Sequence, residues 1–351
     1  MWATLHVKRE KEYICLGKDR RMNSGKVLIT GGSGFIGGEI VRQLSYRGVE
    51  MLNVDFQSPL RSGQERYWCR CDVRDRNRLA EVIWQFAPNH IIHLASDIDV
   101  TMTRLEEYET TIEGTRNLVE LSQRLPNLKR FVHISTQFVV TPGVRPKSET
   151  DFHPYTLYGE AKARSEMIVR GSGRADWVIL RPTIIWGPWH PAFRDGIWKY
   201  IANRCYLHPS AKQPIMRCYG YVENTAEQII RLASVDISRT GRRVFYVGDG
   251  TIDQTRWVDG FAIALTGQPA QKVPKFVLFG LGQIGEGCKK VGVRFPMDKG
   301  RYFRMTTTSD IDLEPTVSLV GTPKIAIEDG IRETVDWLLQ IDPSAFHAIG
   351  V

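Results

Sequence analysis

The sequence predicts an α/β fold in which a doubly wound parallel sheet is followed by a smaller C-terminal lobe. From residue 26 to about 185, short runs rich in β-branched residues alternate with helix-like stretches, a pattern typical of parallel strands joined by crossover helices. The runs are apolar along nearly their whole length, as expected for strands that helices cover on both faces. A glycine cluster directly follows the first run and permits the tight turn with which such a unit begins.

Five strands and four helices are expected in this first region. The strands are residues 26–30, 51–55, 90–96, 130–136 and 177–183, and the helices are residues 36–47, 76–86, 108–124 and 155–169.

Beyond residue 186 the alternation weakens, and Pro, Gly and aromatic residues become frequent. We therefore expect a larger, dinucleotide-binding first domain at 25–185 and a smaller, mainly substrate-binding lobe at 186–345. A helix at 219–234 and a strand at 242–250 have the pattern of elements that return to the main sheet, so the segments near 219–250 are assigned to the first domain.

The composition is that of a soluble globular protein. The chain has 351 residues, of which 42% are hydrophobic and 25% charged, and no window reaches the roughly 18 apolar residues that a membrane span needs. The N-terminus lacks the apolar run of a secretion signal. We therefore expect a cytoplasmic protein with no membrane partner. The six cysteines are scattered without a CxxC pair, which indicates neither a disulfide framework nor a metal site.

The formal charge of +8 does not by itself indicate nucleic-acid binding. Residues 1–21 carry six basic and three acidic side chains, and the chain contains no block of five to eight Lys or Arg residues. A modest positive charge also suits a small, multiply anionic substrate, so no nucleic-acid partner is predicted. Residues 1–24 are expected to be a poorly ordered extension, and whether residues 1–21 belong to the native protein stays open.

The glycine cluster predicts a phosphate-binding turn. Gly31, Gly34 and Gly37 follow the first strand and open a helix; such a triplet provides a tight turn, close approach of the backbone to a pyrophosphate, and close helix–strand packing. The helix N-terminus then offers N–H groups to the phosphates. Asp55 lies 18 residues beyond Gly37, at the end of the second strand, where it can accept hydrogen bonds from an adenosine ribose and repel a 2′-phosphate. The cofactor predicted is NAD, in a Rossmann-like fold; the alternative is a surface Asp55 that touches no ligand.

A tyrosine and a lysine supply the candidate chemistry. Tyr158 and Lys162 are four residues apart in a helix-like stretch and so project from one face. A nearby ammonium favours the phenolate form of a tyrosine, which alcohol oxidation requires. The preceding strand ends with Ser135 and Thr136, and ligands of such sheets bind outside the carboxyl ends of the strands.

Several motifs occur together in the order typical of one family. They are "TGGSGFIGG" (30–38), Asp55, "CDVRD" (71–75), "HLAS" (93–96), "EGTRNLVE" (113–120), "ISTQ" (134–137), "YGEAK" (158–162), "LRPTIIWGP" (180–188), "YVENTA" (221–226) and "PKIAIEDGIRETVDWL" (323–338). The chain from about residue 25 to 340 thereby resembles the extended branch of the short-chain dehydrogenase/reductase family, the NAD-dependent nucleotide-sugar epimerase and dehydratase group. The resemblance is highly specific for the fold and less so for the substrate.

The resemblance implies a role for each matching residue. Tyr158 would be the catalytic acid/base, Lys162 would bind the nicotinamide ribose and lower the pKa of the tyrosine, and Thr136 would hydrogen-bond the reacting oxygen, with Ser135 as the alternative. The residues implied to hold NAD are Gly31, Gly34, Phe35, Ile36 and Gly37 at the pyrophosphate, Asp55 at the adenosine ribose, Asp72 and Val73 beside the adenine, and Leu94, Ala95, Ser96, Ser135, Tyr158 and Lys162 toward the nicotinamide. The alternative interpretation of Asp72 is a loop residue or a helix cap without contact to a ligand. For Thr115 and Asn117 the alternative is packing within the helix.

The sequence also departs from the family pattern. Dehydratases of the group place Asp and Glu after the threonine, whereas this chain has Gln137 and Phe138, so elimination would lack its acid/base partner. Sugar-nucleotide enzymes often carry Asn three residues after the Arg of "LRP", and here Ile184 stands there. Members that resemble 3β-hydroxysteroid dehydrogenases also lack that Asn. The apolar segment 273–282 is either a buried core helix or the lining of a sterol-sized pocket.

The leading functional hypothesis is a redox-neutral, NAD-dependent nucleotide-sugar epimerase of the UDP-glucose 4-epimerase type. The first alternative is an alcohol or ketone oxidoreductase resembling the 3β-hydroxysteroid dehydrogenases, and the second is an NAD-sensing regulator without turnover. The family resemblance implies a homodimer. The candidate diphosphate partners are Arg164, Arg194, Lys199 and Arg217.

Overall fold

The computed structural model describes residues 25–293 and 295–346, and the expected extension at 1–24 lies outside them. The chain divides into two compact units. The first contains the described residues through Ile185, together with Val222–Asp249 and Asp312–Pro323; the second contains Trp186–Tyr221, Gly250–Ile311 and the described residues from Lys324 onward. The assignment of the second unit to substrate binding stays a prediction.

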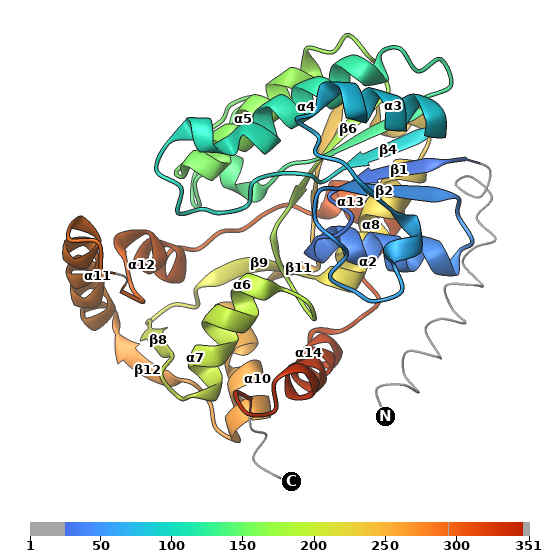
Figure 1. Ribbon diagram of the computed structural model, residues 1–351. Helices are drawn as coiled ribbons and strands as arrows, with labels where there is room; N and C mark the ends of the chain where they lie inside the picture. Colours follow the sequence, from blue (N-terminus) through green and yellow to red (C-terminus); the bar gives the residue numbers. More distant parts are fainter. Residues whose placement is uncertain (1–24, 294, 347–351) are drawn as a thin grey trace. The chain divides into compact units, whose positions relative to one another are not determined.

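The first unit is built on a seven-stranded parallel sheet, which confirms the predicted fold class (Figure 1). Its strands are β1 (Val27–Thr30), β2 (Met51–Asp55), β3 (Trp68–Arg70), β4 (His90–His93), β5 (Arg130–Ile134), β6 (Trp177–Pro182) and β10 (Arg243–Val247). The spatial order is β10-β6-β5-β4-β1-β2-β3, so the sheet grows in opposite directions from β1. In such a sheet the crevice at the carboxyl ends of β1 and β4, where the strand order reverses, is the place for a ligand.

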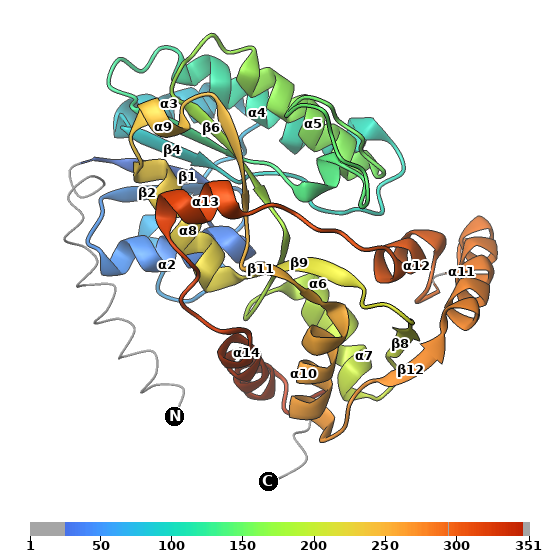
Figure 2. The same ribbon diagram turned by 180° about the vertical axis from the view of Figure 1, so that it is seen from behind.

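Helices cover both faces of this sheet (Figure 1). One face carries α3 (Arg76–Phe86), α4 (Glu109–Ser122) and α5 (Leu157–Arg170), and the other carries α2 (Phe35–Tyr46) and α8 (Val222–Ser234). Figure 2 shows α13 (Glu314–Val320) beside α8, and α9 (Ile237–Thr240) follows α8 in the chain.

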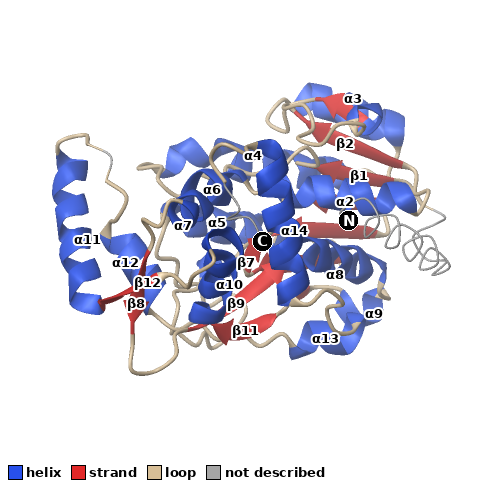
Figure 3. Cartoon of the chain, turned by 90° about the horizontal axis from the view of Figure 1, so that it is seen from below, coloured by secondary structure: helices blue, strands red, loops and turns tan. Residues whose placement is uncertain are grey.

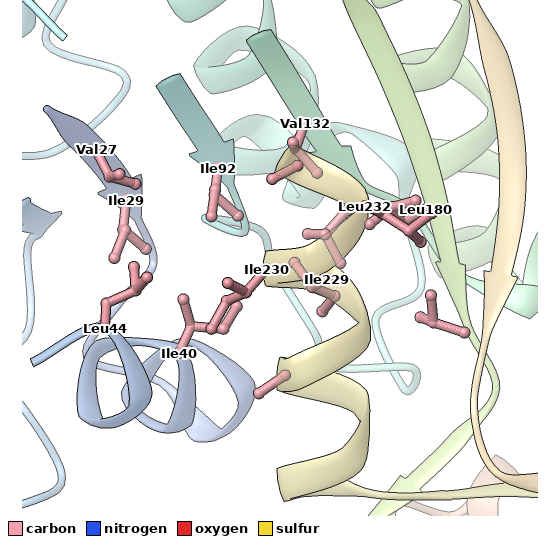
Figure 4. Close-up of a cluster of buried hydrophobic side chains, with 14 of the residues drawn as sticks. Val27, Ile29, Ile40, Leu44, Ile92, Val132, Leu180, Ile229, Ile230 and Leu232 are labelled. Atoms are coloured by element: carbon pink, nitrogen blue, oxygen red, sulfur yellow. The ribbon is translucent and has the colours of Figure 1, made fainter. Parts of the chain in front are cut away.

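The core between the sheet and α2/α8 explains the apolar strands. Figure 4 shows Ile40 of α2 and Ile229 of α8 meeting strand side chains such as Ile29 and Val132. All four are fully buried, and burying a side chain of this size contributes about 1.5–3 kcal/mol each. Since β1, β4, β5 and β6 are buried at every residue, side chains on both faces of these strands lie in the interior, and the strands do not need the alternation of a half-exposed sheet.

The second unit contains short elements around an aromatic core. Its helices are α6 (Pro191–Phe193), α7 (Lys199–Ala202), α10 (Gln254–Thr266), α11 (Lys275–Lys290), α12 (Lys299–Thr306) and α14 (Ile327–Ile341) (Figure 3). Antiparallel β9 (Met216–Tyr221) and β11 (Gly250–Asp253) pair, as do parallel β8 (Leu207–Ser210) and β12 (Gln271–Pro274). Trp198, Trp257 and Phe261 form its centre, which accounts for the aromatic residues of this part of the sequence.

The structure corrects two sequence predictions. Residues 219–221 end strand β9, and the expected helix at 219–234 begins only at Val222. The segment 273–282 does enter a helix, α11, but it is not a buried core helix, because Phe276 is 75% exposed and Phe279 is 50% exposed. The returning strand at 242–250 is confirmed: β10 pairs with β6.

Candidate functional site

The glycine loop links β1 to α2 at the sheet's carboxyl edge. Gly31 has φ +74°, and a Cβ there would lie 2.6 Å from the backbone N of Ala95, so only glycine fits between the loop and the segment after β4. A Cβ at Gly37 would lie 2.2 Å from the Gly31 carbonyl oxygen, so glycine lets α2 approach the loop closely. At Gly34 the nearest atom to a Cβ is 3.4 Å away, which leaves room for a ligand beside the helix start.

The start of α2 has the chemistry of a phosphate site. Within the described residues, no side chain caps the helix at Gly34 and no acidic residue lies in its first turn. The positive end of the helix dipole therefore faces the loop with no acidic side chain of its own first turn to neutralise it. These features fit the pyrophosphate of a dinucleotide.

Asp55 lies at the end of β2 and contacts the same loop. Its carboxylate accepts hydrogen bonds from the backbone N–H groups of Ser33, at 3.1 Å, and Gln57, at 3.0 Å. Burial raises the pKa of Asp55, and those N–H groups oppose the shift. The side chain thus already orders the loop, and its place beyond β2 suits an adenosine ribose.

The turn at 72–75 is held from α4. Asp72 accepts hydrogen bonds from Arg74, which lower the pKa of the carboxyl, and Asn117 donates to the carbonyls of Val73 and Arg74. The Val73 side chain is buried against Gly114, so only its backbone is available beside an adenine. Asn117, interpreted as a packing residue, fixes this turn.

A directed chain of hydrogen bonds anchors the segment after β4. Thr115 donates its hydroxyl proton to the Thr111 carbonyl at 2.6 Å, so it accepts from His93 Nε2 at 2.9 Å. His93 Nδ1 then accepts from the Thr30 hydroxyl at 2.6 Å. Burial lowers the pKa of His93 to about 3, and the ring stays neutral.

The residues expected beside the nicotinamide follow that histidine directly. Leu94 donates its N–H to the Thr30 carbonyl at 2.9 Å, and Ala95 lies against Gly31. The Ser96 hydroxyl hydrogen-bonds that of Thr111 at 2.9 Å. The segment 94–96 is thereby fixed between the glycine loop and α4.

Tyr158 and Thr136 are brought together by the close approach of α5 to the turn after β5. The Thr136 hydroxyl lies close enough to Tyr158 to lower the pKa of the phenol, and it accepts from the Phe138 N–H at 3.2 Å. A Cβ at Gly159 would lie 2.3 Å from the Phe138 carbonyl oxygen, so the glycine permits this approach. Burial raises the pKa of Tyr158 to about 12, against the effect of Thr136. Lys162 is not among the groups that shift this pKa, so the expected lowering by the lysine is absent in the protein alone.

Lys162 is buried one helical turn beyond the tyrosine. Burial lowers its pKa to about 8, and the carboxylates of Glu166 and Asp97 oppose the shift. Ser165 donates to the Lys162 carbonyl at 2.8 Å and accepts from His133 Nε2 at 2.9 Å. The helix at Lys162 is thus tied to β5.

Beneath the lysine lies an ion pair that the sequence analysis missed. Glu166 is fully buried and accepts from Arg181 Nε at 2.9 Å and Nη2 at 2.8 Å. Ser135 donates to Glu166 Oε1 at 2.5 Å, so its hydroxyl is already committed, which favours Thr136 for the reacting oxygen. The available signals were Glu166, four residues after Lys162, and an arginine inside the apolar run 177–183.

The position of a dehydratase carboxylate is occupied by an aromatic ring. Phe138 packs edge-on against Tyr158, at 6.1 Å between centroids, and against Tyr155. Gln137 is buried beside it. Neither side chain can transfer a proton in an elimination.

The four candidate diphosphate partners have different surroundings. Arg164 pairs with Glu160 at 2.7 Å, Arg194 pairs with Asp195 at 2.8 Å, and Arg217 donates to the Thr307 carbonyl. Lys199 is exposed. A role in phosphate binding stays a prediction for each.

Comparison with known proteins gives a family match over most of the chain. The model of the NAD dependent epimerase/dehydratase family matches residues 27–247. A 3-beta-hydroxysteroid dehydrogenase of Mycolicibacterium neoaurum is 32% identical over 183 residues, covering 48% of this chain and 49% of the relative. The chain spans about half the length of this and similar curated relatives. A UDP-glucose 4-epimerase of Vibrio cholerae is 24% identical over 347 residues, covering 93% of this chain and 99% of the relative.

Solved structures share the fold over about nine-tenths of the chain. The UDP-glucose 4-epimerase of Thermotoga maritima, solved with UDP-glucose, has a TM-score of 0.70 at 23% identity, covering 90% of this chain and 99% of its own. The UDP-glucuronic acid 4-epimerase of Bacillus cereus, solved with UDP-glucuronic acid and NAD, has a TM-score of 0.69 at 19% identity, with coverages of 90% and 99%. At these identities the likeness shows the fold alone.

Proposed function

Since the chain belongs to the NAD-dependent epimerase/dehydratase family, we propose that it is a nucleotide-sugar epimerase that works through Tyr158, Thr136 and Lys162. The observation that carries the proposal is that Thr136 and Phe138 both lie against Tyr158: Thr136 lowers the pKa of the phenol, and the Phe138 ring packs edge-on against it. A proton acceptor for a sugar hydroxyl is present, while the carboxylate of an elimination is replaced by a phenyl ring.

The cofactor site fits NAD. Gly31, Gly34 and the start of α2 would hold the pyrophosphate, and Asp55 the adenosine ribose, for the geometric reasons given above. NAD bound there supplies a reversible hydride acceptor. The redox-neutral outcome requires that the substrate hydroxyl be oxidised to a ketone and that this ketone be reduced again within one binding event.

The chain's own residues move and hold the proton. Thr136 orients the phenol of Tyr158, which accepts the proton of the reacting hydroxyl and later returns it. The protein alone keeps the phenol neutral, with a pKa near 12; the charged Lys162 would favour the phenolate once its ammonium is held close to the reacting groups. Phe138 shields the phenol from water on one side.

A second candidate is a 3β-hydroxysteroid dehydrogenase-like oxidoreductase, favoured by Ile184 at the position where nucleotide-sugar enzymes often carry Asn. The half-buried Ile184 offers no polar contact to a diphosphate. Several relatives with 30–32% identity carry the names of such dehydrogenases.

The test begins with the ligand that purified protein retains. Mass spectrometry is expected to find NAD, and incubation with UDP-glucose is expected to give its 4-epimer by NMR without accumulation of NADH. Net NADH formation with a steroid alcohol would instead support the second candidate. Tyr158→Phe is expected to abolish turnover and to leave NAD affinity within a few-fold, because the phenol acts on the substrate proton; unchanged activity in this variant would refute the mechanism.

A further inference from the structure

We propose that helix α11 and the loop after it form a docking surface for an anionic lipid bilayer. The proposal is independent of the catalytic one, since it concerns only the second unit. The sequence predicts no membrane partner because no window is long and apolar enough to span a bilayer, and among the described residues no helix is long and apolar enough to do so. Binding at the bilayer surface requires no span.

The first observation is an exposed apolar stripe along α11. Phe276 is 75% exposed, Phe279 50% and Ile284 54%. At about 100° per residue these three side chains fall within about 140° of one another around the helix, and Gly280 and Gly287 lie within the same sector. The loop that follows adds Val291, 74% exposed. We name these four residues the α11 stripe.

The second observation is that the opposite side of α11 already has a partner. Leu278 is fully buried in a cluster with Met297 and Met305. A Cβ at Gly285 would lie 1.7 Å from the Met297 carbonyl oxygen, so α11 lies tightly against the chain that leads to α12 (Figures 1 and 2). The position of α11 within the second unit is therefore fixed with the stripe outward.

The third observation is charge. Residues 271–306 contain eight Lys and Arg residues and two acidic ones, a net +6 against +8 for the whole chain. Among the described residues, three exposed lysines have no ion-pair partner: Lys289, Lys290 and Lys299. Most of the chain's excess positive charge thus lies in the segment from β12 through α12, of which α11 is a part.

Apolar side chains on α11, together with unpaired cations at its end and at the start of α12, are the two signals that hold a protein at a membrane surface. The phenylalanines enter the boundary of the acyl chains, and the lysines meet anionic headgroups. A second copy of this chain is a poor occupant, because pairing two such surfaces would bring like charges together.

The experiment is sedimentation of the full chain with vesicles. We expect binding to phosphatidylcholine vesicles that contain about 30% phosphatidylglycerol, with little binding to pure phosphatidylcholine and a decrease as salt screens the charges. Phe276→Ser with Phe279→Ser is expected to weaken binding about tenfold or more. Trp84→Ser, at a side chain 50% exposed on α3 of the first unit, is the matched control and is expected to bind as the parent does.

A second pair of variants covers the case in which the serine variant does not fold. A Cβ at Gly280 or Gly287 has no atom within 4 Å, so Gly280→Asp with Gly287→Asp fits and is expected to abolish binding, while Gly280→Ala with Gly287→Ala retains it. Equal binding to both vesicle types, unchanged binding of the aspartate variant, or a parent dimer that this variant splits in the absence of vesicle binding would each overturn the proposal.

Discussion

Buried polar groups around Lys162 show how single residues prepare the site. Burial alone would drive the lysine to its neutral form, and the carboxylates of Glu166 and Asp97 retain part of its affinity for a proton. Glu166 is itself held by Arg181, so the charge of this buried carboxylate is paired. The lysine is thereby poised near neutral pH, where its charge responds to small changes in its surroundings.

This balance predicts a pH limit on activity. With the pKa of Lys162 lowered to about 8, kcat/KM is expected to fall above about pH 8 as the ammonium is lost. Asp97→Asn and Glu166→Gln each remove a carboxylate that raises this pKa. Both variants are therefore expected to shift the alkaline fall of kcat/KM to lower pH. Glu160→Gln, on the exposed side of the same helix, is the control and should leave the profile in place. If the alkaline fall of kcat/KM occurs at the parent's pH in both variants, its assignment to Lys162 is wrong.

The lowered pKa of Lys162 also makes the free energy of unfolding depend on pH. Between about pH 8 and the ordinary lysine value near 10.5, the folded chain binds fewer protons at Lys162 than the unfolded chain does. The contribution of this group to the free energy of unfolding therefore rises with pH in that window. The raised pKa of Tyr158, about 12 against 10, acts in the opposite direction above pH 10.

At the scale of elements, the register of α5 against the turn after β5 decides the catalytic geometry. Thr156 caps α5 by accepting from the Gly159 N–H at 3.0 Å, and the bare Gly159 lets the helix touch the Phe138 carbonyl. Helix start, turn and phenol are thus positioned by one close contact.

Gly159→Ala is expected to separate Tyr158 from Thr136, because a Cβ would need to occupy the space of a backbone oxygen 2.3 Å away. We expect kcat to fall about tenfold to a hundredfold, since small misplacements of catalytic groups cost that much, with NAD affinity retained. Gly171→Ala is the control at the other end of α5, where the nearest atom is 3.3 Å away. Steady-state kinetics and NAD titration separate the two effects, and a fully active Gly159→Ala enzyme would show that the contact is dispensable.

At the scale of the whole molecule, the chain leaves and re-enters its two units several times. The first unit takes α8, β10 and α13 from segments that flank parts of the second. The sheet that would hold the cofactor is therefore completed by residues more than 200 positions from the glycine loop.

NAD is expected to stabilise the first unit by binding its folded state alone. At a concentration about a hundredfold above Kd, the gain is about 2.7 kcal/mol, seen as a higher thermal midpoint. Hydrogen exchange should slow in the glycine loop and at the carboxyl ends of β1, β2 and β4, while α11 exchanges as before. An Asp55→Ala variant should show a smaller rise in midpoint, and an undiminished rise would remove Asp55 from the ribose site.

The sequence by itself determined the sheet, the glycine turn and the placement of Tyr158 and Lys162 on one helix, because those depend on local periodicity and on spacing along the chain. Short strands such as β3 and β12 escaped prediction because three or four residues carry too little pattern. Only the tertiary structure decided that Ser135 donates to Glu166 and that Arg181 pairs with the same carboxylate near Lys162. It also decided that the phenylalanines of α11 face outward. Those outcomes depend on which distant side chains are buried together. The cost of burying a charge is set by these neighbours, and the local sequence around a residue does not reveal them.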